Sequence, residues 1–130
     1  MVAVTLRCVI VDDSPAVLRA ASELLERQGV AVVAVAANCE EAMRVIGRAR
    51  ADVVLIDIDL GPESGFDLAR RLAATAERPG SPSILTSTHD GRDFATLIAA
   101  SPAIGFLPKS ELSAEAIHRL LTDAHVEGRY

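Results

Sequence analysis

The chain has 130 residues, of which 50% are hydrophobic and only 3% aromatic, and its formal net charge is −5. This length fits one domain with a hydrophobic core, and a core rich in aliphatic side chains favours a parallel α/β sheet. The acidic balance, without a basic cluster, argues against direct nucleic-acid binding by this domain. No apolar run approaches the length of a membrane span, and the N-terminus lacks the layout of a signal peptide. We therefore expect a cytoplasmic protein that makes no membrane contact.

The two cysteines, Cys8 and Cys39, do not form a metal-binding motif. Cys8 begins an apolar run and Cys39 lies near an expected helix start. We expect both to be free thiols, buried or half-buried, which is consistent with a reducing compartment.

Strand-like and helix-like segments alternate from the first residues onward. An apolar run predicts a strand over 6–11, and Ser14-Pro15 then supplies an N-cap followed by proline at the first helical position. Apolar residues at helical spacing continue to Gly29, which is expected to end this helix. A second strand is predicted over 30–36, and Asn38 with Glu41 resembles a capping box that begins the next helix.

The second half of the chain repeats this alternation. A strand is expected over 52–58, followed by a loop with Gly61-Pro62 and Gly65, and then by a helix whose apolar stripe is Ala69, Leu72, Ala73 and Ala76. A connector over 78–82 leads to a strand over 83–87 and to a weaker helix over 91–100, with Phe94, Leu97 and Ile98 facing inward. The last expected elements are a strand over 103–107 and a helix from Glu111 to about Val126. Five β-α units predict a doubly wound, five-stranded parallel sheet of the flavodoxin-like (βα)5 type. One domain over 1–130 is expected, with no linker and no second domain.

Carboxylates follow two of the expected strands directly. Val9-Ile10-Val11 leads into Asp12 and Asp13, and Val53-Val54-Leu55-Ile56 leads into Asp57. Because parallel-sheet proteins place their sites at the carboxyl edge of the sheet, the three side chains converge if these strands are neighbours. Carboxylates packed together repel one another, and Mg²⁺ is the natural cation for a small all-oxygen pocket.

Further polar residues follow the later strands. Ser87 and Thr88 lie at the end of the fourth, and Lys109 follows the fifth. All of them can therefore face the same crevice as the carboxylates.

With these residues in order, the chain resembles a response-regulator receiver domain, the phosphoacceptor half of two-component signalling. The matching positions are Asp12, Asp13, Asp57, Ser87, Phe106 and Lys109. The intervals from Asp57 to Ser87 (87 − 57 = 30 residues) and from Ser87 to Lys109 (109 − 87 = 22 residues) suit the layout of that family. The resemblance covers essentially the whole chain.

The resemblance implies that Asp57 accepts a phosphoryl group from a sensor histidine kinase, and that the domain is otherwise not an enzyme. Asp13 and Asp57 would hold Mg²⁺, with Asp12 mainly through water and the backbone carbonyl of Asp59 as a further ligand. Lys109 would contact a phosphate oxygen as a point charge. Ser87 would donate a hydrogen bond to another oxygen, and Phe106 would follow the movement of the Ser87 loop as a switch.

Some positions depart from the family pattern. Gly61 stands where a proline is common, and Ser110 rather than proline follows Lys109, so we expect a trans peptide at that joint. Thr88 is bulkier than the residue usually found at its position, and His89 is expected at the mouth of the pocket. Our hypothesis is that Asp59, Thr88 and His89 together set the rate at which the acyl phosphate hydrolyses.

Several alternatives stay open at this stage. Thr88 instead of Ser87 is a candidate for the switch hydroxyl, and Phe106 is also explained as ordinary core. Asp57-Ile58-Asp59 resembles the Asp-x-Asp motif of haloacid-dehalogenase-type phosphatases, although that motif usually lies on the first strand of a longer chain. A receiver-like interaction module that works without phosphorylation is a third interpretation.

The output is less defined by the sequence. The chain fits a stand-alone receiver that acts on a downstream protein target, or a regulator whose DNA-binding domain is missing from this chain. The expected output face comprises Phe94, Leu97, Phe106 and the region of Ile117. Homodimerisation through this face is a further possibility.

Overall fold

The computed structural model describes residues 5–75, 80–89 and 91–128. Five parallel strands form one sheet in the order β2-β1-β3-β6-β7. They are β1 (Arg7–Val11), β2 (Ala31–Ala36), β3 (Val53–Asp57), β6 (Ser83–Ser87) and β7 (Gly105–Pro108). The predicted doubly wound, flavodoxin-like parallel sheet is confirmed, with small shifts at the strand ends.

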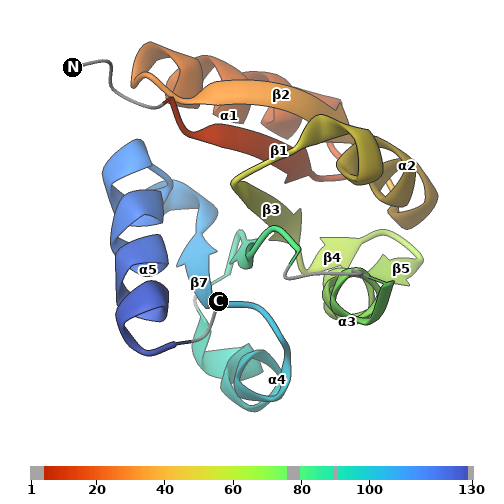
Figure 1. Ribbon diagram of the computed structural model, residues 1–130. Helices are drawn as coiled ribbons and strands as arrows, with labels where there is room; N and C mark the ends of the chain where they lie inside the picture. The colour runs from red at the N-terminus through yellow and green to blue at the C-terminus, as the bar shows by residue number, and fades with distance from the viewer. Residues whose placement is uncertain (1–4, 76–79, 90, 129–130) are drawn as a thin grey trace.

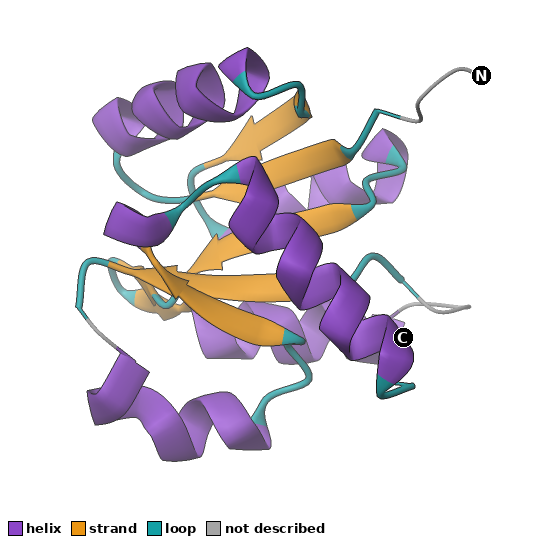
Figure 2. Cartoon of the chain, turned by 90° about the vertical axis from the view of Figure 1, so that its left-hand side faces the viewer, coloured by secondary structure: helices purple, strands orange, loops and turns teal. Residues whose placement is uncertain are grey.

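Helices cover both faces of this sheet (Figures 1 and 2). One face packs against α1 (Pro15–Arg27) and α5 (Ala114–Val126), through buried residues that include Leu25 and Ile117. Ile117 is 0% exposed, so its predicted place on the output face is wrong. The opposite face packs against α2 (Cys39–Ala49), α3 (Gly65–Thr75) and α4 (Ala95–Ala100). Because both faces are buried, the central strands read as continuous apolar runs rather than as alternating patterns.

Side-chain caps fix where three helices begin. Ser14 Oγ accepts a hydrogen bond from the Val17 amide at 3.3 Å, and Asn38 Oδ1 accepts one from the Glu41 amide at 2.8 Å. These contacts confirm the predicted starts of α1 and α2. The predicted start of the last helix at Glu111 is wrong, because Ser113 caps α5 through the Ala116 amide at 3.0 Å.

Two other segments differ from the sequence prediction. The expected plain loop after Asp57 contains a short antiparallel hairpin of β4 (Asp59–Leu60) and β5 (Glu63–Ser64). The expected helix over 91–100 is divided into a 3₁₀ turn, η1 (Gly91–Phe94), and α4. Leu97 is 52% exposed, so its predicted inward orientation is wrong; the i, i+4 pair Phe94 and Ile98 takes the place toward the core.

Two predictions fall partly outside the described residues: Ala76 of the third helix stripe, and 78–79 of the connector. Residues 109–111 form a 3₁₀ turn, η2 (Lys109–Glu111), instead of the start of the last helix. No cis peptide bond occurs in the described segments, which include the Lys109-Ser110 joint.

Both cysteines are free and buried, as expected. Burial raises the pKa of the Cys8 thiol to about 12. Burial also raises the pKa of Cys39, and a hydrogen bond with Glu63 adds to that effect. Among the described residues, no helix has the length and apolar character needed to cross a bilayer.

Candidate functional site

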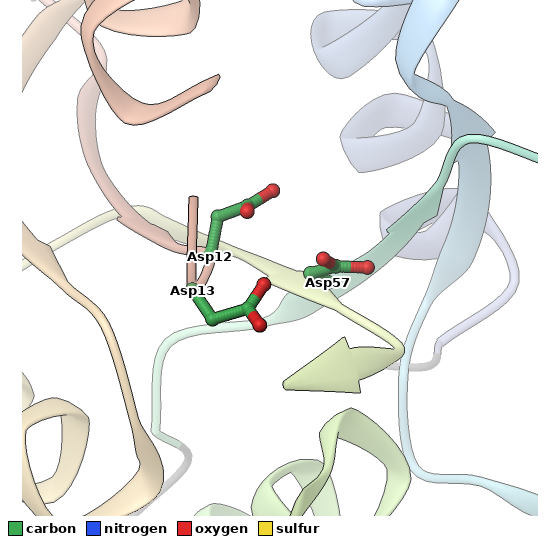
Figure 3. Close-up of side chains that lie close together, drawn as sticks. All are labelled: Asp12, Asp13 and Asp57. Carbon is green, nitrogen blue, oxygen red and sulfur yellow. The ribbon is translucent and has the colours of Figure 1, made fainter. Parts of the chain in front are cut away.

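The carboxyl ends of β1 and β3 bring three acidic side chains together (Figure 3). The two strands are direct neighbours, with Val11 in register with Ile56, so Asp12 and Asp57 emerge side by side. Asp12, Asp13 and Asp57 each offer a carboxylate oxygen, and these oxygens lie within 4.8 Å of one another. Asp12 and Asp57 are only 2% and 5% exposed, whereas Asp13 is exposed.

Lys109 reaches this cluster from the end of β7. Its Nζ lies 2.6 Å from Asp12 Oδ2 and 3.1 Å from Asp57 Oδ2. Burial by itself would lower the pKa of Lys109, but the hydrogen bonds to Asp12 and Asp57 outweigh burial and raise the pKa. The ammonium group therefore stays charged and offsets part of the repulsion between the two carboxylates.

The Asp57 carboxylate is oriented by its own backbone neighbourhood. The Asp59 amide donates a hydrogen bond to Asp57 Oδ1 at 3.1 Å, while Lys109 binds the other oxygen. Burial raises the pKa of Asp57, and these two donors oppose the shift without cancelling it. One side chain thus has both oxygens held in place at the edge of the sheet.

A glycine permits the close approach of α3 beneath Asp57. A Cβ atom on Gly65 would lie 2.1 Å from the Asp57 carbonyl oxygen, and the Gly65 amide donates to the Ile58 carbonyl at 3.0 Å. A side chain at this position would therefore separate α3 from the end of β3.

Ser87 and Thr88 occupy different environments. Ser87 is 3% exposed, pairs with Pro108 across β6 and β7, and accepts a hydrogen bond from the His89 amide at 3.0 Å on its Oγ. Thr88 and His89 are exposed beyond the strand end. Of the two hydroxyl residues, Ser87 is the one held at the sheet edge, as the last residue of β6, the strand that pairs with β3.

Phe106, in β7, is half-buried and packs against the core, but it is not one of the fully buried core residues. Its ring lies beneath the start of η1, because a Cβ atom on Gly91 would be only 3.0 Å from its Cδ1. The ring is therefore in contact with the segment that follows the Ser87 loop.

The donor set suits a hard divalent cation. Three carboxylates from two neighbouring strand ends supply oxygen ligands only, and one of them, Asp13, is open to solvent. Oxygen ligands with water access are the environment that Mg²⁺ prefers. The residues that are present therefore fit a Mg²⁺ site.

Sequence reasoning missed three residues of the neighbourhood. In the sequence, Gly61 and Gly65 only marked the loop after Asp57. Gly61 has a φ of +72°, which proline cannot adopt, and this accounts for glycine at a position where the family commonly has proline. Glu63 Oε1 accepts a hydrogen bond from the Cys39 amide at 3.1 Å. No local pattern predicts a contact between residues this far apart in the chain.

Comparison with known proteins agrees with this geometry. The profile of the response regulator receiver domain matches residues 8–122. The chain belongs to the response regulator receiver family. This membership leaves the alternative interpretation, a haloacid-dehalogenase-type phosphatase, without support.

Individual relatives carry the receiver in different settings. A protein-glutamate methylesterase/protein-glutamine glutaminase of Hahella chejuensis is 32% identical over 78% of this receiver, which spans only 29% of that protein. Protein PilH of Pseudomonas aeruginosa is 34% identical over 65% of the receiver and 69% of its own length. The crystal structure of a LuxR-family two-component response regulator from Aurantimonas sp. superimposes on this chain with a TM-score of 0.76 and 31% sequence identity. The match covers 97% of this chain and 88% of that one.

Proposed function

We propose that this receiver accepts a phosphoryl group on Asp57 from a sensor histidine kinase and changes its output surface in response. The observation that carries the proposal is the convergence of Asp12, Asp13, Asp57 and Lys109 at one edge of the sheet. Family membership supports the same function. The residues that would hold Mg²⁺ are Asp12, Asp13 and Asp57, together with the backbone carbonyl of Asp59.

The chemistry requires little from the protein beyond position and charge. An oxygen of Asp57 forms a bond to phosphorus while the bond from phosphorus to the donor breaks, which leaves an acyl phosphate and a released donor group. Bound Mg²⁺ supplies charge neutralisation for the phosphoryl oxygens. Lys109 already lies within hydrogen-bond distance of Asp57 Oδ2, so its ammonium group is close enough to contact a phosphoryl oxygen attached there.

Ser87 and Phe106 are the residues we assign to the switch. The Ser87 hydroxyl accepts from the His89 amide and still has its own proton to donate to a phosphoryl oxygen. A hydrogen bond that exists only with phosphate present favours one position of the loop after β6. Phe106 would respond because its ring contacts Gly91, at the start of the next turn.

We further propose that Asp59, Thr88 and His89 set the lifetime of the acyl phosphate. All three are exposed and follow the strands that carry Asp57 and Ser87. The test is to replace the three together and measure dephosphorylation by intact mass after the phosphodonor is removed. An unchanged lifetime would refute this part of the proposal.

The output is proposed to be a protein contact. The relatives point to two kinds of partner, because one is a methylesterase/glutaminase and another is a LuxR-family regulator. We propose a cytoplasmic signalling role in which a downstream protein target, or a DNA-binding domain outside this chain, reads the surface around Leu97 and Phe106. Homodimerisation through this surface would serve the same purpose, without direct nucleic-acid contact by the receiver.

The test compares the wild-type chain with Asp57→Asn after treatment with acetyl phosphate and Mg²⁺. We expect one phosphoryl adduct by intact mass in the wild type, none in Asp57→Asn, and none when the metal is chelated. Size-exclusion chromatography of the same samples reports whether phosphorylation changes the oligomeric state. Wild-type protein that is never labelled would favour the phosphorylation-independent module. Repeated turnover of a generic phosphomonoester would restore the phosphatase interpretation.

A further inference from the structure

The hairpin formed by β4 and β5 lies directly against the carboxylate cluster. It begins two residues after Asp57, and its tip contains Gly61. A Cβ atom on Gly61 would be 3.5 Å from Asp13 Oδ2, so the hairpin tip is in ordinary contact range of the exposed carboxylate. The hairpin therefore forms one wall of the site, next to the Asp13 side chain.

This hairpin is too short to hold its shape alone. Each strand has two residues, and isolated two-stranded hairpins are at best marginally stable in water. Leu60, which is 2% exposed, anchors one strand in the core below α2 and α3. The other strand has Glu63, whose side chain is the contact that reaches across to α2.

The Glu63 side chain binds the first turn of α2. Glu63 Oε1 accepts from the amide of Cys39, the first residue of α2, at 3.1 Å. Amide groups in the first turn of a helix have no partner within the helix, and a negative charge is favoured there. The local cap serves two other amides: the Asn38 side chain accepts from the Glu41 amide, and the Glu41 side chain accepts from the Ala37 amide. Glu63 therefore supplies the Cys39 amide with an acceptor that the local cap does not provide.

We infer that Glu63 is a positioning residue for the metal site: it ties the hairpin to the start of α2 and so keeps the wall beside Asp13 in place for Mg²⁺. This inference rests on the proposed function of the Asp12, Asp13 and Asp57 cluster. Glu63 itself is not a ligand. Its effect passes through the hairpin, from the Cys39 amide on one side to Gly61 and Asp13 on the other.

The test is a Mg²⁺ titration followed by backbone amide shifts in NMR spectra, together with initial rates of labelling by acetyl phosphate. We expect Glu63→Ala to raise the half-saturating Mg²⁺ concentration about threefold to tenfold, the loss typical of one hydrogen bond. The labelling rate at saturating Mg²⁺ should stay unchanged. Exchange of the Cys39 amide with solvent should become faster in the same variant.

Two matched variants separate position from charge. Glu63→Gln keeps an oxygen that accepts from the Cys39 amide and should retain most of the wild-type Mg²⁺ affinity. Glu40→Ala removes an equal charge from the turn of α2 that Glu63 contacts, at an exposed residue next to Cys39. This variant should leave Mg²⁺ binding unchanged. If Glu63→Gln or Glu40→Ala weakens binding as much as Glu63→Ala, charge is responsible and the inference is wrong.

The failure of this inference differs from the failure of the proposed function. A wild-type chain that neither binds Mg²⁺ nor becomes labelled refutes the proposed function and, with it, the role of Glu63. A wild-type chain that does both, with Glu63→Ala indistinguishable from it in Mg²⁺ titration, refutes only the positioning role.

Discussion

The carboxyl edge of the sheet has two halves that differ in how firmly they are held. In the half around β1 and β3, every residue of β3 is buried, and the Asp57 carboxylate is bound on both oxygens. In the half around η1, α4 and β7, no residue of η1 or α4 is buried and all of β7 is half-buried. The carboxylate cluster lies in the first half, while Phe106 and Leu97 lie in the second.

This difference suits a signalling domain. The phosphorylation that we propose at Asp57 would benefit from groups that are already in position, because reorganisation during the reaction adds to its barrier. A response to that chemistry requires a segment with few buried contacts, whose alternative arrangement is close in free energy. The firmly packed half therefore fits phosphorylation, and the loosely packed half fits its readout.

The largest expected effect is at Gly65, in the firmly held half. Gly65→Ala places a methyl group against the Asp57 carbonyl oxygen and the Ile58 backbone. These are backbone atoms, which cannot move away by changing a side-chain rotamer. We expect the free energy of unfolding to fall by about 3 kcal/mol or more, as measured by urea denaturation. Gly47→Ala in α2 is the control, because nothing lies within 4 Å of its added Cβ. We expect this control to gain about 0.5–1 kcal/mol, and equal effects at the two sites would contradict the prediction.

A pair of leucines compares the helices of the two halves directly. Leu68 in α3 is fully buried, whereas Leu97 in α4 is 52% exposed. Leu68→Ala should lower the free energy of unfolding by about 3 kcal/mol, and Leu97→Ala by about 0.5 kcal/mol at most. Urea denaturation of both variants measures the contrast, and a large loss at Leu97 would show that α4 is held more firmly than its exposure indicates.

Lys109 connects the two halves, since it follows β7 and binds the carboxylates of β1 and β3. Lys109→Met leaves Asp12 and Asp57 without their cation at a site where the lysine side chain is only 18% exposed. We expect Lys109→Met to lower the free energy of unfolding by about 2 kcal/mol in the presence of a chelator. The decrease should be smaller when Mg²⁺ is added.

Arg119→Met is the control for Lys109, because Arg119 pairs with Glu115 on the exposed side of α5. Its effect should stay within about 0.5 kcal/mol. Denaturation curves with and without Mg²⁺ measure all of these values. Lys109→Met as stable as the wild type in chelator would contradict the bridging role.

A small effect is expected at Gly91, in the loosely held half. A Cβ atom there would lie 3.0 Å from Phe106 Cδ1, and a ring can turn to relieve this contact. We expect Gly91→Ala to change stability by about 1 kcal/mol or less and to shift the Phe106 ring resonances without phosphorylation. In a double-mutant cycle with Phe106→Leu the effect should largely disappear, and a full effect without the ring would contradict it.

Much of the fold was predictable from local patterns. Apolar runs ending in Asp12 and Asp57, the caps at Ser14 and Asn38, and the alternation of elements each depend on residues close together in the chain. The prediction failed where a local pattern had a competitor. The last helix begins at Ser113 instead of Glu111, and Leu97 faces solvent because Phe94 and Ile98 take the core positions.

The sequence by itself determined the doubly wound parallel sheet and the strand-end residues at its carboxyl edge, whereas the order of the strands, with β1 beside β3, came from the structure. This was possible because strand-end positions follow from chain order once the sheet is parallel. Only the tertiary structure decided that Lys109 binds both Asp12 and Asp57, that Gly65 lies against the backbone of Asp57, and that Glu63 reaches α2. These contacts join segments far apart in the chain or depend on a backbone approach of a few ångströms, and neither is encoded in a local pattern of residue types.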